Sequence, residues 1–217
     1  SEERPPASKD APAKEKPKKA APELLRGFRD ILADEQPYWD KIRDVADALA
    51  HAYSYDRIEL PLLEREELFV RTLGKSTDVV EKEMYVFEDP SQDTIALRPE
   101  APASAARAYI NHGMLNLPQP VKMYYQGPMF RHDRPQAGRY RQFHQFGFEC
   151  FGSAESIIDA QLIVIANQFF KELGIEVVMQ INSIGTPETR REYEGELANY
   201  FRAFRSRFDE DDKRRLQ

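Results

Sequence analysis

The spacing of hydrophobic residues switches along the chain between the helical and the extended type. From Asp34 to Tyr53, bulky side chains recur every three or four residues, which predicts an amphipathic helix. The same spacing predicts further helices at Glu64–Arg71, Pro102–His112, Ser156–Leu173 and from Pro187 onward.

Segments with two-residue alternation lie between these helices. Short turns around Pro90 and around Pro135 separate two pairs of such segments. Because strands joined by short turns pair in antiparallel fashion, the pattern predicts an antiparallel sheet flanked by helices, the α+β class. The predicted strands are Arg57–Leu60, Glu83–Asp89, Asp93–Glu100, Val121–Asp133, Arg141–Gly152 and Glu176–Asn182.

The composition separates a short tail from the rest of the chain. Residues 1–22 hold five prolines and six lysines or arginines with hardly any bulky apolar side chain. Such a segment cannot bury enough surface to offset its chain entropy, so we predict that it is disordered. It could contact RNA phosphates or serve only as a solvated linker. The globular part is predicted at residues 23–217.

Composition also excludes several classes of protein. The lone cysteine, Cys150, leaves no internal disulfide and no cysteine-based zinc site. No apolar run approaches the roughly 18 residues of a membrane span, and no signal-peptide core is present. With a net charge of −6, any contact with nucleic acid requires a local basic patch. We therefore expect a cytoplasmic protein that makes no contact with a membrane.

The segment Phe130–Glu149 carries more guanidinium groups than a core strand would and more aromatic rings than a solvated loop would. It holds four arginines and four phenylalanines. Guanidinium forks bind phosphates bidentately and rings stack on flat bases, so the segment predicts a site for a nucleoside triphosphate. Neither a Walker loop nor a dinucleotide-binding glycine motif occurs. The arginines surrounding the turn are Arg131, Arg134, Arg139 and Arg141.

The strand after this turn offers a second candidate feature. Strand alternation places Phe143, Gln145, Gly147 and Glu149 on one face, and we predict that Gly147 leaves room for a ligand. The alternative is an exposed sheet surface without a ligand. Glu149, together with Glu100, would repel a phosphate backbone and attract an amino group or an imidazole.

The arginine-rich segment resembles the second motif of class II aminoacyl-tRNA synthetases, in the form found in the histidyl-tRNA synthetase family. The similarity covers "GPMFR", "RPQ" and "GRYRQFHQ" with the following glutamate, and extends from about Gly27 to the end. "TDVVEKEMYVFED", "LRPEA", "RAYINHGM" and "INSIG" are also similar to family segments. The helix from Asp34 and the strand to Pro61 resemble the first motif, which builds the homodimer interface in this family.

The resemblance implies a ligase of protein biosynthesis that activates histidine with ATP and transfers it to tRNA(His). Mg²⁺ is expected on the ATP phosphates, and no metal ligand is implied in the chain. Arg131 is implied as the catalytic residue. The implied ATP-binding residues are Arg131, Asp133, Arg139, Tyr140 and Phe143, and the implied histidine-binding residues are Glu100, Gln145 and Glu149.

The sequence departs from the family pattern at three points. Pro102 stands where the family usually has threonine, and Asp133 where it usually has glutamate. The third class II motif, the histidine-specific segment and the anticodon-binding domain are not found. We therefore expect residues 23–217 to be the front part of a catalytic domain and to be inactive alone.

Three other interpretations stay open. One is a catalytically silent paralogue that senses histidine, such as the regulatory subunit of ATP phosphoribosyltransferase. Another is a dimer scaffold. The last is a metal site at His132 and His144, although no acidic partner stands at ligand spacing from them.

Overall fold

The computed structural model describes residues 22–75, 77–183, 185–209 and 212–213, so the tail predicted to be disordered lies almost wholly outside it. The chain divides into two compact units, Ser1–Gly174 and Ile175–Gln217. Within the described residues, no helix combines the length and the apolar character that crossing a membrane requires. Every residue predicted to belong to a site lies in the first unit.

The first unit contains two small sheets, as the predicted α+β class requires. Both have three strands, in the orders β1-β5-β6 and β2-β4-β3. All pairs are antiparallel except β1 with β5, which is parallel. The strands are β1 (Asp56–Arg57), β2 (Leu63–Arg65), β3 (Tyr85–Glu88), β4 (Thr94–Leu97), β5 (Val121–Phe130) and β6 (Gln142–Phe151).

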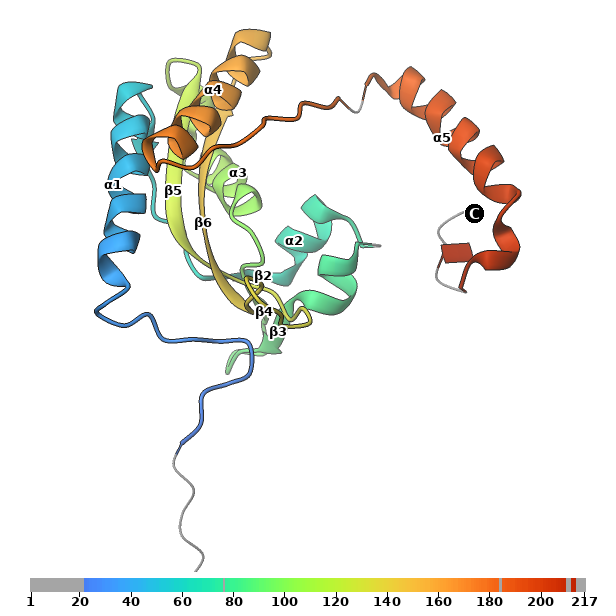
Figure 1. The fold of residues 1–217 in the computed structure, drawn as a ribbon, viewed down its shortest axis with the longest axis horizontal. Coiled ribbons are helices and arrows are strands. Elements are labelled where there is room, and N and C mark those ends of the chain that lie inside the picture. Colours follow the sequence, from blue (N-terminus) through green and yellow to red (C-terminus); the bar gives the residue numbers. More distant parts are fainter. Residues whose placement is uncertain (1–21, 76, 184, 210–211, 214–217) are drawn as a thin grey trace, which may run out of the picture. The chain divides into compact units, whose positions relative to one another are not determined.

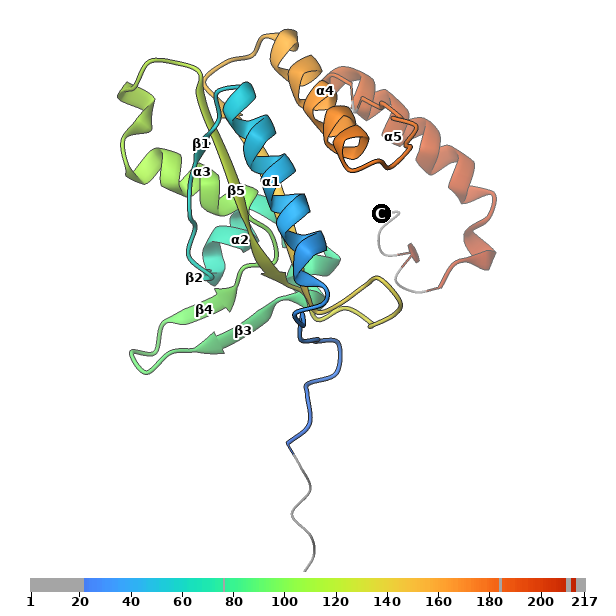
Figure 2. The same cartoon turned by 60° about the vertical axis from the view of Figure 1, so that its left-hand side comes forward.

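The long β5–β6 hairpin is the frame of the unit. Its two ten-residue strands pair without a break from Val121 opposite Phe151 to Phe130 opposite Gln142. Because side chains alternate along a strand, even-numbered residues share one face and odd-numbered residues the other. The second sheet lies at the end of this hairpin where its loop is, as Figure 2 shows.

Helices cover the two faces of the hairpin differently. Helices α1 (Gln36–Ala52) and α4 (Ser156–Glu172) lie on the even-numbered face, where Leu49 and Phe169 pack against Phe146 (Figure 1). Helix α3 (Pro102–Asn111) lies on the other face and covers only part of it. Phe151, at the end of β6 far from the loop, stacks on Tyr109 of this helix, so a site on this face has to lie nearer the loop.

The remaining elements are short. Helix α2 (Glu66–Leu73) inserts Phe69, which is fully buried, between β4 and α3. A π-helical turn, η1 (Val79–Glu83), and a 3₁₀ turn, η2 (Met114–Asn116), were not predicted from the sequence. In the second unit, α5 (Pro187–Arg202) begins after Thr186, whose hydroxyl accepts from the Thr189 N–H, and the 3₁₀ turn η3 (Arg205–Arg207) follows.

Two predicted strands differ from the structure. The first, predicted at Arg57–Leu60, is only two residues long, because its pairing with β5 covers only Asp56 and Arg57. The prediction of a strand at Glu176–Asn182 is wrong, since this segment has no regular structure. Its apolar side chains lie in solvent, with Val178 89% and Ile181 73% exposed. A strand needs a neighbour, and the described part of the second unit contains none.

Candidate active site

The loop between β5 and β6, residues 131–141, is called the arginine loop below. Its ends are joined by a hydrogen bond from the Arg131 N–H to the Arg141 carbonyl, 2.9 Å long. Its tip is a tight turn closed by Gln136 and Arg139, and Gly138 there has φ +77°, a conformation that favours glycine. The hairpin therefore presents the loop as one compact feature.

Arg131, the first residue of the loop, has its side chain held by three neighbours. Its Nε donates to the Pro99 carbonyl at 2.9 Å. Its guanidinium carbon lies 5.4 Å from the centre of the Phe143 ring, and its Nη2 lies 3.9 Å from a Glu100 oxygen. Two segments, Pro99–Glu100 and β6, thus hold one guanidinium group, which limits its reorganisation when a ligand arrives.

A cavity of about 430 Å³, here called the loop cavity, opens beside Arg131. Asp133 accepts from the Arg139 Nη1 at 2.8 Å on its wall. The five residues implied as ATP-binding all line it, so the structure brings that predicted set together. The lining residues are Val79, Glu83, Arg131, Asp133, Gly138, Arg139, Tyr140 and Phe143.

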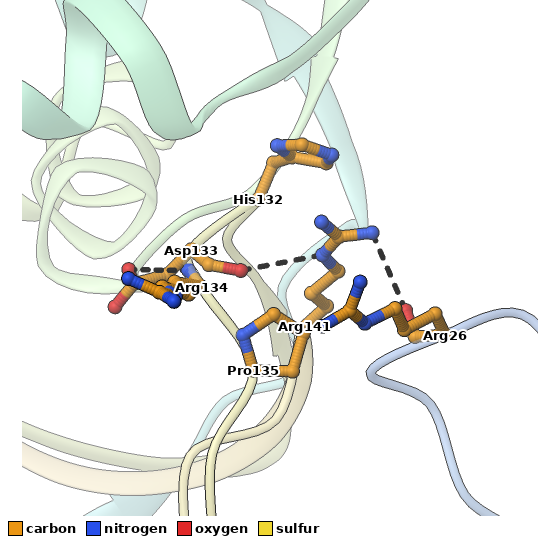
Figure 3. A pocket seen from close by; sticks show the side chains of 6 residues that line it. All are labelled: Arg26, His132, Asp133, Arg134, Pro135 and Arg141. Atoms are coloured by element: carbon orange, nitrogen blue, oxygen red, sulfur yellow. Dashed lines mark hydrogen bonds between the residues drawn. The ribbon is translucent and has the colours of Figure 1, made fainter.

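A second cavity of about 410 Å³ is lined by residues near the two ends of the loop (Figure 3). Arg134 and Arg141 line it together with Arg26, so the four predicted arginines do not share one site. The Arg141 guanidinium donates to the carbonyls of Arg26 and Asp133, both at 3.3 Å. The Arg141 N–H donates to the Gly27 carbonyl at 2.7 Å. Arg141 therefore anchors the amino-terminal segment to the loop.

The prediction that Gly147 leaves room for a ligand is wrong. Gly147 stands opposite Tyr125 in the hairpin register, and a Cβ on Gly147 would overlap the Tyr125 phenol oxygen. The space is therefore filled by a tyrosine ring and holds no ligand. That phenol donates to Glu149 at 3.0 Å. The sequence could not show this, because it depends on which residue of β5 faces the glycine.

The carboxylates Glu100 and Glu149 have unusual electrostatics. Burial raises the pKa of Glu100, and the charge of Arg131 opposes that rise. Burial also raises the pKa of Glu149, a hydrogen bond from Tyr125 lowers it, and the charge of Glu100 raises it. Two partly buried carboxylates that influence each other favour a ligand carrying an ammonium group or an imidazole N–H.

Comparison with known proteins decides the family. The sequence profile of histidyl-tRNA synthetase matches residues 27–187. The chain belongs to the histidyl-tRNA synthetase family. The histidine–tRNA ligase of Halorhodospira halophila is 47% identical over 194 residues, which are 89% of this chain and 46% of that protein. The chain thus spans about half the length of the curated relatives it matches.

Two solved structures resemble the fold of this family member. The apo histidyl-tRNA synthetase of S. aureus has a TM-score of 0.71 and 34% identity, covering 91% of this chain and 46% of its own. A Bacillus halodurans protein named as an ATP phosphoribosyltransferase regulatory subunit/histidyl-tRNA synthetase has a TM-score of 0.61 and 25% identity. That match covers 71% of this chain and 38% of the other.

Within this family member, sequence reasoning missed Arg98. Its side chain is 3% exposed and donates to the carbonyls of Leu60 at 2.7 Å and Pro128 at 2.9 Å. Its guanidinium fills the space beside Gly127, which faces Gln145 across the hairpin. The "LRPEA" segment contains Arg98 and is similar to a family segment, but the sequence analysis singled out only its glutamate, Glu100.

The two histidines considered as metal ligands have separate surroundings. The His132 ring packs edge-on against Tyr85 at 5.6 Å, and the His144 ring against Trp39 at 4.6 Å. Burial, with the charges of Arg43 and Arg29, lowers the pKa of His144. Both rings therefore serve as packing groups in this structure.

Proposed function

We propose that the protein is a histidine–tRNA ligase that activates histidine with ATP and transfers it to tRNA(His). The observation that carries this proposal is the position of Arg131. Its guanidinium lines the loop cavity with Phe143 and Arg139, and it lies 3.9 Å from Glu100. One fixed cation therefore lies both on the wall of a cavity suited to a nucleotide and beside a carboxylate suited to an amino group.

The reaction needs such a junction. A carboxylate oxygen of histidine attacks the α-phosphorus of ATP, the bond to the bridging oxygen of the β-phosphate breaks, and pyrophosphate leaves. Negative charge grows on the five-coordinate phosphorus, so a guanidinium held in place beforehand stabilises the transition state more than the substrates. We assign this role to Arg131, which the Pro99 carbonyl and the Phe143 ring hold.

Histidine recognition falls to the odd-numbered face of β6 and the segment before α3. Glu100 and Gln145 would take the amino group, and Glu149 would accept from the imidazole N–H. A neutral imidazole offers one donor and one acceptor. A site that pairs such groups rejects apolar amino acids, because these leave its polar atoms without partners.

ATP recognition falls to the loop cavity. Phe143 would stack on adenine, Arg139 would bind the outer phosphates, and Asp133 and Tyr140 would complete the wall. Mg²⁺ bound to phosphates accepts one or two carboxylates. Glu83 lines this cavity, so its carboxylate would hold the ion there. The ion, when bound, would neutralise phosphate charge.

We further propose that residues 23–217 form the front part of a class II catalytic domain. The remaining parts would supply the third motif and the anticodon-binding domain, so aminoacylation belongs to the whole encoded protein. A homodimer through α1 and the strand that follows it, acting in the cytoplasm, completes this proposal. Family membership supports it.

A histidine-sensing regulatory subunit is the second candidate. The resemblance to the Bacillus halodurans protein, whose name includes such a subunit, favours it, and so does Pro102. This proline starts α3 next to Glu100 and supplies neither a hydroxyl nor an N–H.

ATP–pyrophosphate exchange with each standard amino acid, followed by tRNA charging, separates the two. We expect exchange that depends on histidine alone, in the protein as its gene encodes it. Histidine binding without exchange would establish the regulatory function, and the absence of histidine binding would contradict both.

A further inference from the structure

Tyr125 has a buried phenol that none of the roles above uses. Its side chain is 5% exposed in β5, and its ring crosses Gly147 on the opposite strand. The phenol donates to the Oε1 of Glu149 at 3.0 Å. The position of the Tyr125 ring therefore requires glycine at position 147, because any side chain there would displace the ring.

The surroundings of Glu149 make this donor important. The titratable groups that act on or are influenced by Glu149 are Tyr125 from β5, Glu100 before α3, and Tyr55 before β1. In the part of the chain that the structure describes, no lysine, arginine or histidine forms an ion pair with Glu149. The phenol is therefore its side-chain donor there, and it leaves Oε2 available.

We propose that Tyr125 is a positioning residue, which holds the Glu149 carboxylate so that its second oxygen faces the imidazole N–H of histidine. This inference rests on the proposed function for its ligand, but the hydrogen bond itself does not. A carboxylate fixed by one donor has fewer orientations to lose when a ligand binds. Tyr125 would thus contribute to histidine selectivity without touching histidine.

A purely structural role has to be separated from this one. Tyr125 also packs in an apolar cluster with Ala101 and Met129, so losing its ring would damage the core. The variant Tyr125→Phe keeps the ring and removes only the donor. Tyr124→Phe is the matched control, because the Tyr124 phenol donates at 2.9 Å to Asp47 on the opposite face.

The first experiment needs no ligand. Thermal unfolding of Tyr125→Phe, Glu149→Gln and the double variant forms a double-mutant cycle. We expect Tyr125→Phe to lower the melting temperature more in the parent than in the Glu149→Gln background, because the phenol bonds more strongly to a charged carboxylate than to a neutral amide. An equal loss in both backgrounds would show that Tyr125 does not act through Glu149, and would overturn the proposal.

The second experiment is histidine-dependent ATP–pyrophosphate exchange across pH in the full protein. Tyr125→Phe should raise the KM for histidine about tenfold, as expected for losing a hydrogen bond to a charged group. The KM for ATP should stay within about twofold. Donation from Tyr125 lowers the pKa of Glu149, so its loss raises that pKa and moves the acid limb of kcat/KM to higher pH. The titration of histidine itself is common to both enzymes.

The outcomes of these experiments distinguish a failure of the proposed function from a failure of the positioning role of Tyr125. If the parent protein does not activate histidine, the proposed function fails, and the unfolding cycle alone judges the bond between Tyr125 and Glu149. If the parent is active and Tyr125→Phe leaves both the KM for histidine and the acid limb unchanged, the positioning role is wrong. An equal change in Tyr124→Phe would also overturn it.

Discussion

The two halves of the candidate site hold their charges in different ways. In the loop cavity, the side chains of Arg139 and Asp133 are 59% and 28% exposed and pair with each other. The other half, here called the histidine half, contains the residues proposed to bind histidine and Tyr125. There Glu100 is 19% exposed and Tyr125 is 5% exposed, and the pKa of each is raised, chiefly by burial. Solvent screens the first set, whereas the second depends on its ligand for compensation. Substitutions in the histidine half should therefore be sensitive to pH, and those in the loop sensitive to salt.

Arg131 joins the two halves, so its loss should have the largest effect. Arg131→Ala should slow histidyl-adenylate formation by roughly 10²–10³-fold, comparable to removing one preorganised donor that stabilises developing charge. ATP–pyrophosphate exchange measures it. Arg134→Ala is the control, since Arg134 lines the second cavity. A rate within roughly threefold of the parent would remove Arg131 from the mechanism.

Glu149→Gln should weaken the binding of histidine and leave the binding of ATP nearly unchanged. We expect the affinity for histidine to fall about 10- to 100-fold, as a charge-assisted hydrogen bond is lost, while the affinity for ATP stays within about twofold. Titration calorimetry with each ligand is the measurement. Equal losses for the two ligands would mean that Glu149 supports the fold and does not read the side chain.

The same variant should gain stability. The pKa of Glu149 is raised in the folded state, so between the unfolded and folded values the folded protein binds more protons than the unfolded chain. The free energy of unfolding therefore falls as pH rises through that window and stays lowered above it. Glu149→Gln removes this penalty and should be more stable at neutral pH by on the order of 1 kcal/mol.

Thermal unfolding as a function of pH tests this gain. The advantage of Glu149→Gln should disappear below the unfolded pKa of about 4.3. A variant that is less stable than the parent at neutral pH, and equally so in acid, would show that the carboxylate is not strained by burial.

The smallest effect is expected in the loop. Asp133→Asn breaks the pair with Arg139, and such an exposed pair contributes under about 1 kcal/mol to stability, less at high salt. Glu64→Gln is the contrasting control, because Glu64 is 9% exposed and accepts both Nε and Nη2 of Arg107. Denaturant unfolding should show the larger loss for Glu64→Gln. The reverse order would contradict the comparison.

Local patterns predicted the local parts of this structure. The helical spacing found α1, α3 and α4, and alternation found both strands of the long hairpin. The five residues implied as ATP-binding lie together in the loop cavity, because all of them lie within one hairpin and its loop.

Contacts between distant residues were not predictable. The prediction at Gly147 failed because the register that brings Tyr125 over it is a property of two strands. The prediction of a phosphate site at Arg141 did not foresee its partner Arg26, which lies 115 residues away. The strand expected at Glu176–Asn182 failed for the same reason, since alternation shows an extended preference and says nothing of a neighbour.

A crystal structure of the full protein with a non-hydrolysable mimic of histidyl-adenylate tests the central claim most directly. The account predicts that the phosphate mimic lies on the Arg131 guanidinium, that adenine stacks on Phe143, and that the imidazole N–H donates to the Glu149 oxygen not bound by Tyr125. An imidazole that points away from Glu149, or an adenine outside the loop cavity, would contradict it.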